Sequence, residues 1–188
     1  MKPFEDCLKK GRLKKIEPDA ERVAGELDTA KEELERARSS YMNRNWDEAA
    51  TQACFAMLRC ARAAINSRGY RDTNLYGLCI GLQELLVEGG ELSANVVKEI
   101  RTAKDIKDAV YSGHRASYRD ARQLLQWAQF LARDVFKLVA LPGFEAGEIS
   151  TVIPDPPERA ERAEPRPRTD RDPDRQPWRN HSNNRWAS

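Results

Sequence analysis

The stretch NWDEAATQACFAMLRCARAAINSRGYRDTNLY, residues 45–76, decides the fold, because it holds one long helix, its end and the start of another. Asn45 suits the N-cap position, and the acids Asp47 and Glu48 suit the positive end of the helix dipole. Gly69 suits the left-handed residue that follows many helices. Small side chains let neighbouring helices approach closely, so we expect this helix at the centre of the fold; they are Ala49, Ala50, Ala53, Ala56, Ala61, Ala63 and Ala64.

Further helices are expected on both sides of this stretch. Apolar residues recur there every three or four positions, as on one face of a helix. Proline and acids favour a start near Pro18, and Ser117 with Asp120 resembles a capping box. Patterns typical of strands are scarce, and the loops are short. The sequence therefore predicts an all-α fold, an antiparallel bundle of four or five helices, with ranges of about 18–41, 45–68, 72–88, 93–111 and 117–141.

The chain divides into three parts by composition. Residues 1–17 form a basic N-terminal arm with five positive charges between Lys9 and Lys15, and a short helix near residues 4–13 is compatible with it. Residues 18–141 form the helical domain. Residues 142–188 hold most of the prolines and few apolar side chains, which cannot offset the entropy of ordering a chain. They predict a flexible, largely disordered tail, in which Trp178 and Trp186 are candidate anchors for a partner.

The composition excludes several classes of function. The 32 basic and 30 acidic residues nearly cancel, so only local patches can attract a polyanion. No apolar run is long enough to span a bilayer, and the N-terminus lacks the apolar core of a signal peptide, which favours a cytoplasmic protein. The four cysteines form no Cys-x-x-Cys pair and have no histidine cluster beside them. We therefore expect reduced, buried thiols, and neither a metal nor a cofactor.

The first candidate site lies at the end of the helix predicted over residues 93–111. Lys107 and Tyr111 are four residues apart and share one face, and His114 follows the flexible pair Ser112 and Gly113. Histidine transfers protons near neutral pH, and lysine binds phosphate, so the three are candidate catalytic residues. The alternative is an ordinary helix end at which lysine and histidine complement the negative end of the dipole.

Two further groups are candidates for binding RNA or phosphate. Arg115, Arg119 and Arg122 form a basic stripe with spacings of four and three residues, which can follow an RNA backbone or simply form a solvated face. Arg68, Arg71 and Asn74 surround the start of the helix predicted from residue 72, where backbone N–H groups favour a phosphate. Ordinary helix capping is the alternative for this second group.

Several segments together resemble the HEPN family (the higher-eukaryote and prokaryote nucleotide-binding domain). The segments are Asn-Trp-Asp-Glu-Ala at 45–49, Ala-Arg-Ala-Ala at 61–64, Gly-Tyr-Arg-Asp-Thr-Asn at 69–74 and Lys-Asp-Ala-Val-Tyr-Ser-Gly at 107–113. The resemblance implies a helical bundle that forms a homodimer. It also implies binding or metal-independent cleavage of RNA, often in prokaryotic toxin–antitoxin or defence systems. The partner that it implies is a minimal nucleotidyltransferase.

The chain departs from the signature of active members, an arginine and a histidine separated by four to six residues. His114 has Lys107 before it at that spacing, and Arg68 is followed by Asn74 instead of histidine. Lysine lacks the bidentate fork of arginine, and asparagine does not transfer protons at neutral pH. The literal match, Arg175 to His181, falls in the predicted tail.

Two main functions remain open from the sequence, beside a third in which the chain is a purely structural interaction bundle that uses Trp178 and Trp186. In the first, the chain cleaves RNA, with His114 as general acid and base, Lys107 and Arg115 on the phosphate, and Tyr111 orienting it. In the second, it is a non-catalytic dimeric adaptor or nucleotide-binding module.

Overall fold

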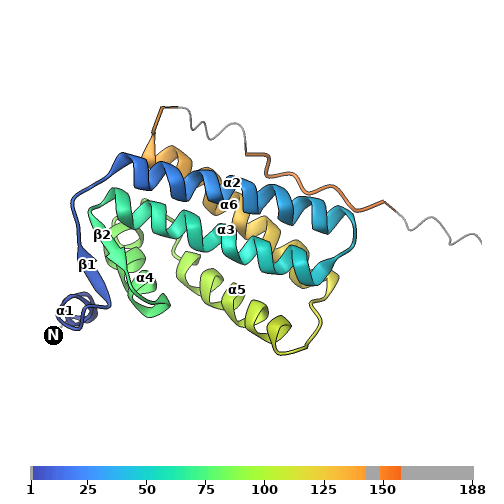
Figure 1. Ribbon diagram of the computed structural model, residues 1–188, viewed down its shortest axis with the longest axis horizontal. Helices are drawn as coiled ribbons and strands as arrows, with labels where there is room; N and C mark the ends of the chain where they lie inside the picture. The colour runs from blue at the N-terminus through green and yellow to red at the C-terminus, as the bar shows by residue number, and fades with distance from the viewer. Residues whose placement is uncertain (1, 143–148, 158–188) are drawn as a thin grey trace, which may run out of the picture. The chain divides into compact units, whose positions relative to one another are not determined.

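The computed structural model describes residues 2–142 and 149–157, and they form a mostly helical fold with one pair of short strands (Figure 1). The predicted helical character is confirmed. The predicted tail falls largely outside the described residues, and so do Trp178, Trp186 and the Arg175–His181 match. The elements in chain order are α1 (Pro3–Lys9), β1 (Leu13–Lys15), α2 (Ala20–Met42), α3 (Trp46–Ser67), β2 (Tyr70–Asp72), α4 (Leu75–Leu82), the π-helical turn η1 (Gln83–Val87), α5 (Val96–Tyr111) and α6 (Tyr118–Val139).

Helix α2 buries a single stripe and exposes its other faces. Asp19 is its N-cap, and its carboxylate accepts hydrogen bonds from the backbone N–H groups of Glu21 and Arg22 at 3.0 and 3.2 Å. This satisfies two donors that the first turn cannot pair internally. The stripe predicted from the sequence is buried throughout; it consists of Val23, Leu27, Ala30, Leu34, Ala37 and Tyr41.

Helix α3 is the centre of the fold, as its alanines predict. It packs against α2, α5 and α6 and also contacts α4 and β2. All seven alanines named above are fully buried, so the neighbouring backbones approach without intervening side chains. The helix ends where expected, because Gly69 has a φ of +76°, a conformation that other residues adopt at a cost.

Helix α6 begins with the predicted capping box. The Ser117 hydroxyl accepts from the backbone N–H of Asp120 at 3.1 Å, and the Asp120 carboxylate accepts from the backbone N–H of Ser117 at 2.8 Å. Residues 149–157, which fall within the predicted tail, are connected to this helix: Asp155 accepts a hydrogen bond from the Tyr118 hydroxyl at 3.0 Å. Ile149 and Ile153 pack against the core.

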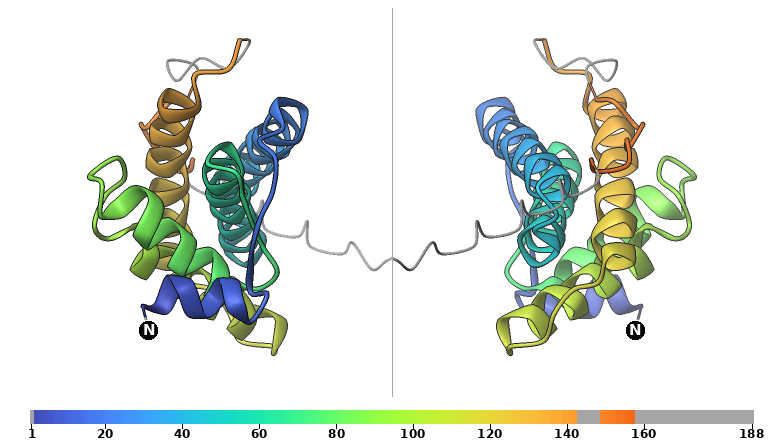
Figure 2. Two further views of the ribbon diagram at one scale, coloured as in Figure 1. Left: turned by 90° about the vertical axis from the view of Figure 1, so that its left-hand side faces the viewer. Right: turned by 90° about the vertical axis from the view of Figure 1, so that its right-hand side faces the viewer.

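The strand pair is the main departure from the predicted elements. β1 and β2 are antiparallel, with Leu13 opposite Asp72, Lys14 opposite Arg71 and Lys15 opposite Tyr70. As a result, α1 ends before Leu13, and α4 begins at Leu75 with Asn74 as its N-cap instead of at residue 72 or 73. Figure 2 shows α1 beside α4 and the strands, and α1 contacts both α4 and β1.

The core is continuous from α1 to α6 and contains the four cysteines. Cys7, Cys54, Cys60 and Cys79 are buried as free thiols. Within the described residues, no helix combines the length and apolar character that crossing a membrane requires.

Candidate functional site

The structure brings together two of the three predicted catalytic residues. Lys107 is only 9% exposed, and its Nζ lies 4.6 Å from the centre of the Tyr111 ring and 2.9 Å from the Asp108 carboxylate. Tyr111 is 65% exposed. The exposed His114 is engaged elsewhere, because its Nδ1 lies 3.2 Å from the carbonyl oxygen of Ala109 at the end of α5. No hydrogen bond joins His114 to Lys107 or Tyr111 in the described part of the chain.

The two predicted phosphate-binding arginines near α6 do not both lie on the helix, because Arg115 precedes its first residue. Arg115 forms an ion pair with Asp47 at 3.2 Å, and the same carboxylate accepts from the backbone N–H of Ala116 at 2.6 Å. Arg119 is exposed. A hollow of about 270 Å³ beside Tyr111 is lined by three carboxylates and one arginine; its charged residues are Glu33, Arg36, Asp47 and Glu48. This surface repels phosphate more than it attracts it.

Two of the residues predicted around the start of α4 have structural roles. Arg68 forms an ion pair with Glu91. The Asn74 carboxamide oxygen accepts from the backbone N–H of Gly77 at 2.8 Å and thereby caps α4. The third, Arg71, lies at a larger site.

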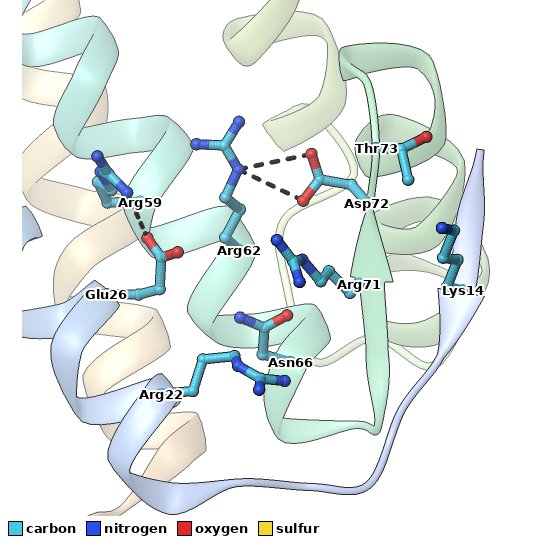
Figure 3. Close-up of a pocket in the computed structure, with 9 residues that line it drawn as sticks. All are labelled: Lys14, Arg22, Glu26, Arg59, Arg62, Asn66, Arg71, Asp72 and Thr73. Atoms are coloured by element: carbon cyan, nitrogen blue, oxygen red, sulfur yellow. Dashed lines mark hydrogen bonds and ion pairs between the residues drawn. The ribbon is translucent and has the colours of Figure 1, made fainter. Parts of the chain in front are cut away.

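Arg71 lines a cleft of about 640 Å³ at the end of the molecule where the strands meet α2 and α3 (Figure 3). In this view Arg71 extends from β2 toward Arg62 and Asn66, while Lys14 rises from β1. The charged lining consists of five basic residues and two acids, which leaves a net positive charge; these are Lys14, Arg22, Arg59, Arg62, Arg71, Glu26 and Asp72.

Each element places its residues at the cleft for a local reason. Arg59, Arg62 and Asn66 are spaced by three and four residues, so they share the face of α3 that looks away from its alanine-packed side. Arg22 lies in the first turn of α2. The loop after β2 is fixed to the N-terminal arm, because the Thr73 N–H donates to the Arg12 carbonyl and the Thr73 hydroxyl to the Gly11 carbonyl, both at 3.0 Å.

Three of the four guanidinium groups at the cleft are held by carboxylates. The Nη2 of Arg22 lies 3.5 Å from an Asp19 oxygen at the start of α2. The Nη1 of Arg59 lies 3.1 Å from a Glu26 oxygen, which joins α3 to α2. The Nε of Arg62 lies 3.3 and 3.5 Å from the two Asp72 oxygens, and the Asp72 side chain is only 6% exposed. Arginines held in this way keep further N–H groups free for a ligand, since each guanidinium carries five donors.

Lys14 and Arg71 are two cations without a carboxylate partner in residues 2–142 and 149–157. They lie directly opposite each other in the strand pair, an arrangement that destabilises an antiparallel ladder. Between them and Arg22, Asn66 is 4% exposed, and its Oδ1 accepts no hydrogen bond from the described residues. A bound anion would relieve the repulsion between the two cations.

Of the residues that line this cleft, the sequence pattern placed Arg71 in a candidate site and Lys14 in the basic N-terminal arm. The sequence does contain a pattern that could have indicated three other cleft residues. Arg59, Arg62 and Asn66 form a polar stripe on a helix that is otherwise rich in alanine. Lys14 and Arg22 join the cleft only through the pairing of β1 with β2 and the packing of α2 on α3. Neither contact leaves a local pattern in the sequence.

The side chains of the cleft are suited to binding an anion and less suited to catalysing cleavage of a phosphodiester bond. Its described lining includes no histidine, and the described residues contain no group of three or more metal-binding side chains. No known protein family, curated protein or solved structure matches the chain.

Proposed function

We propose that this chain is a HEPN-like helical bundle that binds RNA, and that the cleft between the strands, α2 and α3 holds RNA phosphate. The observation that carries the proposal is the convergence of five basic side chains on one cleft that contains only two carboxylates. Arginine binds phosphate through paired N–H groups, and both lysine and arginine release counterions from nucleic acid.

We propose binding without cleavage as the activity of the cleft. Cleaving RNA without a metal requires a group that moves protons beside the phosphate, and histidine is the usual one. The cleft lining offers lysine, arginine, two carboxylates, one amide and one hydroxyl. This favours the non-catalytic, nucleotide-binding alternative over the nuclease. Cleavage by His114, Lys107 and Tyr111 rests on the family resemblance, and so do the homodimer and the nucleotidyltransferase partner.

The test is the affinity of the chain for a fluorescein-labelled single-stranded oligoribonucleotide, measured by anisotropy at several salt concentrations. Replacing both Lys14 and Arg71 by alanine should weaken binding at least about tenfold and flatten the salt dependence by roughly one unit of slope, because the contact of these two cations with RNA phosphate is lost. Lys15→Ala is the matched control, since Lys15 lies on the same strand but does not line the cleft. An unchanged dissociation constant in the double variant would refute the assignment of the site.

The cleavage alternative has its own readout. Incubating the same oligoribonucleotide with wild-type protein and chelator should leave it intact. Metal-independent cleavage that disappears in His114→Ala would instead place a nuclease at the end of α5.

A further inference from the structure

The basic side chains at the cleft surround one space and do not form an extended row along the surface. Basic residues reach the cleft from four elements, β1, α2, α3 and β2, and surround a common space. Two cations of the N-terminal arm outside the cleft are engaged: the Arg12 guanidinium lies 5.3 Å from the centre of the Tyr76 ring, and Lys10 pairs with Asp6 at 2.9 Å. An RNA backbone carries one charge per nucleotide along a line, so it matches an extended groove better than this arrangement.

Lys14 and Arg71 match a group with two negative charges. Directly opposite residues in an antiparallel pair have Cβ atoms about 5 Å apart, so both side chains can reach one phosphate. A phosphate monoester carries roughly 1.5 to 2 negative charges at neutral pH and has three terminal oxygens. A phosphodiester carries a single charge and two such oxygens. The two unpaired cations therefore complement the monoester.

Asn66 adds a neutral hydrogen-bonding group to the same space. It is almost completely buried on the cleft side of α3, and its Oδ1, a hydrogen-bond acceptor, has no partner in the described residues. Leaving a buried acceptor unpaired is unfavourable, so a ligand that donates a hydrogen bond to this oxygen, such as a ribose hydroxyl next to the phosphate, gains from its presence.

We infer that the cleft recognises a phosphate monoester, the terminal phosphate of an RNA chain, and not the internal backbone. This inference rests on the proposed RNA-binding function. Three sources share the chemistry: a 5′-phosphate end, a 3′-phosphate end and a free nucleoside monophosphate.

The experiment compares four ligands of matched sequence with the full chain by titration calorimetry. They are one oligoribonucleotide with a 5′-phosphate, the same with a 3′-phosphate, the same with hydroxyls at both ends, and a nucleoside monophosphate. At least one phosphorylated end should bind about tenfold or more tightly than the hydroxyl form. Lys14→Ala and Arg71→Ala should each remove this preference, and Lys15→Ala should keep it. Both cleft residues are exposed, and circular dichroism verifies that the variants fold.

A pH series provides an independent readout. The second proton of a phosphate monoester binds with a pKa of about 6, so the preference for the phosphorylated end should shrink between pH 7.5 and 5. The hydroxyl-ended oligonucleotide has no such ionisation. The charged groups that face the cleft are Lys14, Arg22, Arg59, Arg62, Arg71, Glu26 and Asp72, none of them a histidine.

The outcomes separate this inference from the proposed function. Equal affinity for all three oligoribonucleotides, lost in the Lys14 and Arg71 variants, would overturn end recognition and leave RNA binding intact. Binding of the monophosphate but of no oligoribonucleotide would overturn RNA binding and retain the monoester site. No binding of any ligand would overturn both.

Discussion

Two glycine-to-alanine substitutions should change stability in opposite directions. Gly77 lies inside α4, and a Cβ at this position would stand 2.8 Å from the carbonyl carbon of Arg12 and closer still to its oxygen. That carbonyl also accepts the Thr73 N–H at 3.0 Å, so it cannot move away freely. Gly25 lies inside α2, and a Cβ there meets nothing within 4 Å.

The magnitudes follow from this geometry. Alanine is favoured over glycine inside a helix by about 1 kcal/mol, so Gly25→Ala should raise the free energy of unfolding by roughly 0.5–1 kcal/mol. In Gly77→Ala the same gain is outweighed by overpacking of about 1–3 kcal/mol and by loss of the Thr73 hydrogen bond, about 1 kcal/mol. Gly77→Ala should therefore lower stability by about 1–3 kcal/mol.

Urea and thermal unfolding followed by circular dichroism measure both variants. A gap of about 2 kcal/mol between them corresponds to roughly 4–8 °C in Tm for a chain of this length. Since the clash lies two residues before Lys14, Gly77→Ala should also weaken binding at the cleft, whereas Gly25→Ala should not. Equal stability of the two variants would refute the close packing of α4 on the N-terminal arm.

Two further predictions concern the helix cap and the thiols. Ser117→Ala should lower the free energy of unfolding by about 1 kcal/mol, because it removes the capping box with Asp120, while the exposed Ser39→Ala should have little effect in the same urea titration. Burial raises the pKa of Cys54 to about 11 and that of Cys60 to about 12, from an ordinary value of 9.0. The unfolded chain therefore releases these protons first, so stability should fall as pH rises above 9 in urea titrations. At pH 8 the folded protein should react with a thiol reagent far more slowly than the protein in urea.

Features with a local pattern could be predicted from the sequence, and features made by distant pairing could not. The stripe of α2, the alanines and terminal glycine of α3, and the Ser117 cap each depend on residues within a few positions, and each agrees with the structure. The strands are three residues long and pair positions 13–15 with 70–72, so neither shows a recognisable alternation.

The candidate site illustrates the same limit. Lys107 continues the buried spacing of Val96, Ile100 and Ala103 on α5, a pattern that the sequence contains. Its positive charge predicts phosphate binding, but the side chain is almost fully buried and forms an ion pair with Asp108. The residues around Arg71 come from β1, α2 and α3 as well as from β2, so no single segment of the sequence reveals them.

The pairing of β1 with β2 has a consequence for the order in which the molecule folds. Helices α2 and α3 are joined by a short loop and can associate early, whereas Lys14 meets Arg71 only after the long intervening segment has closed. The cleft should therefore assemble late and open first, with backbone amides of the two strands exchanging hydrogen for deuterium sooner than those of α3. An anion that joins both strands would slow this exchange, so ligand binding and completion of the fold are one linked equilibrium.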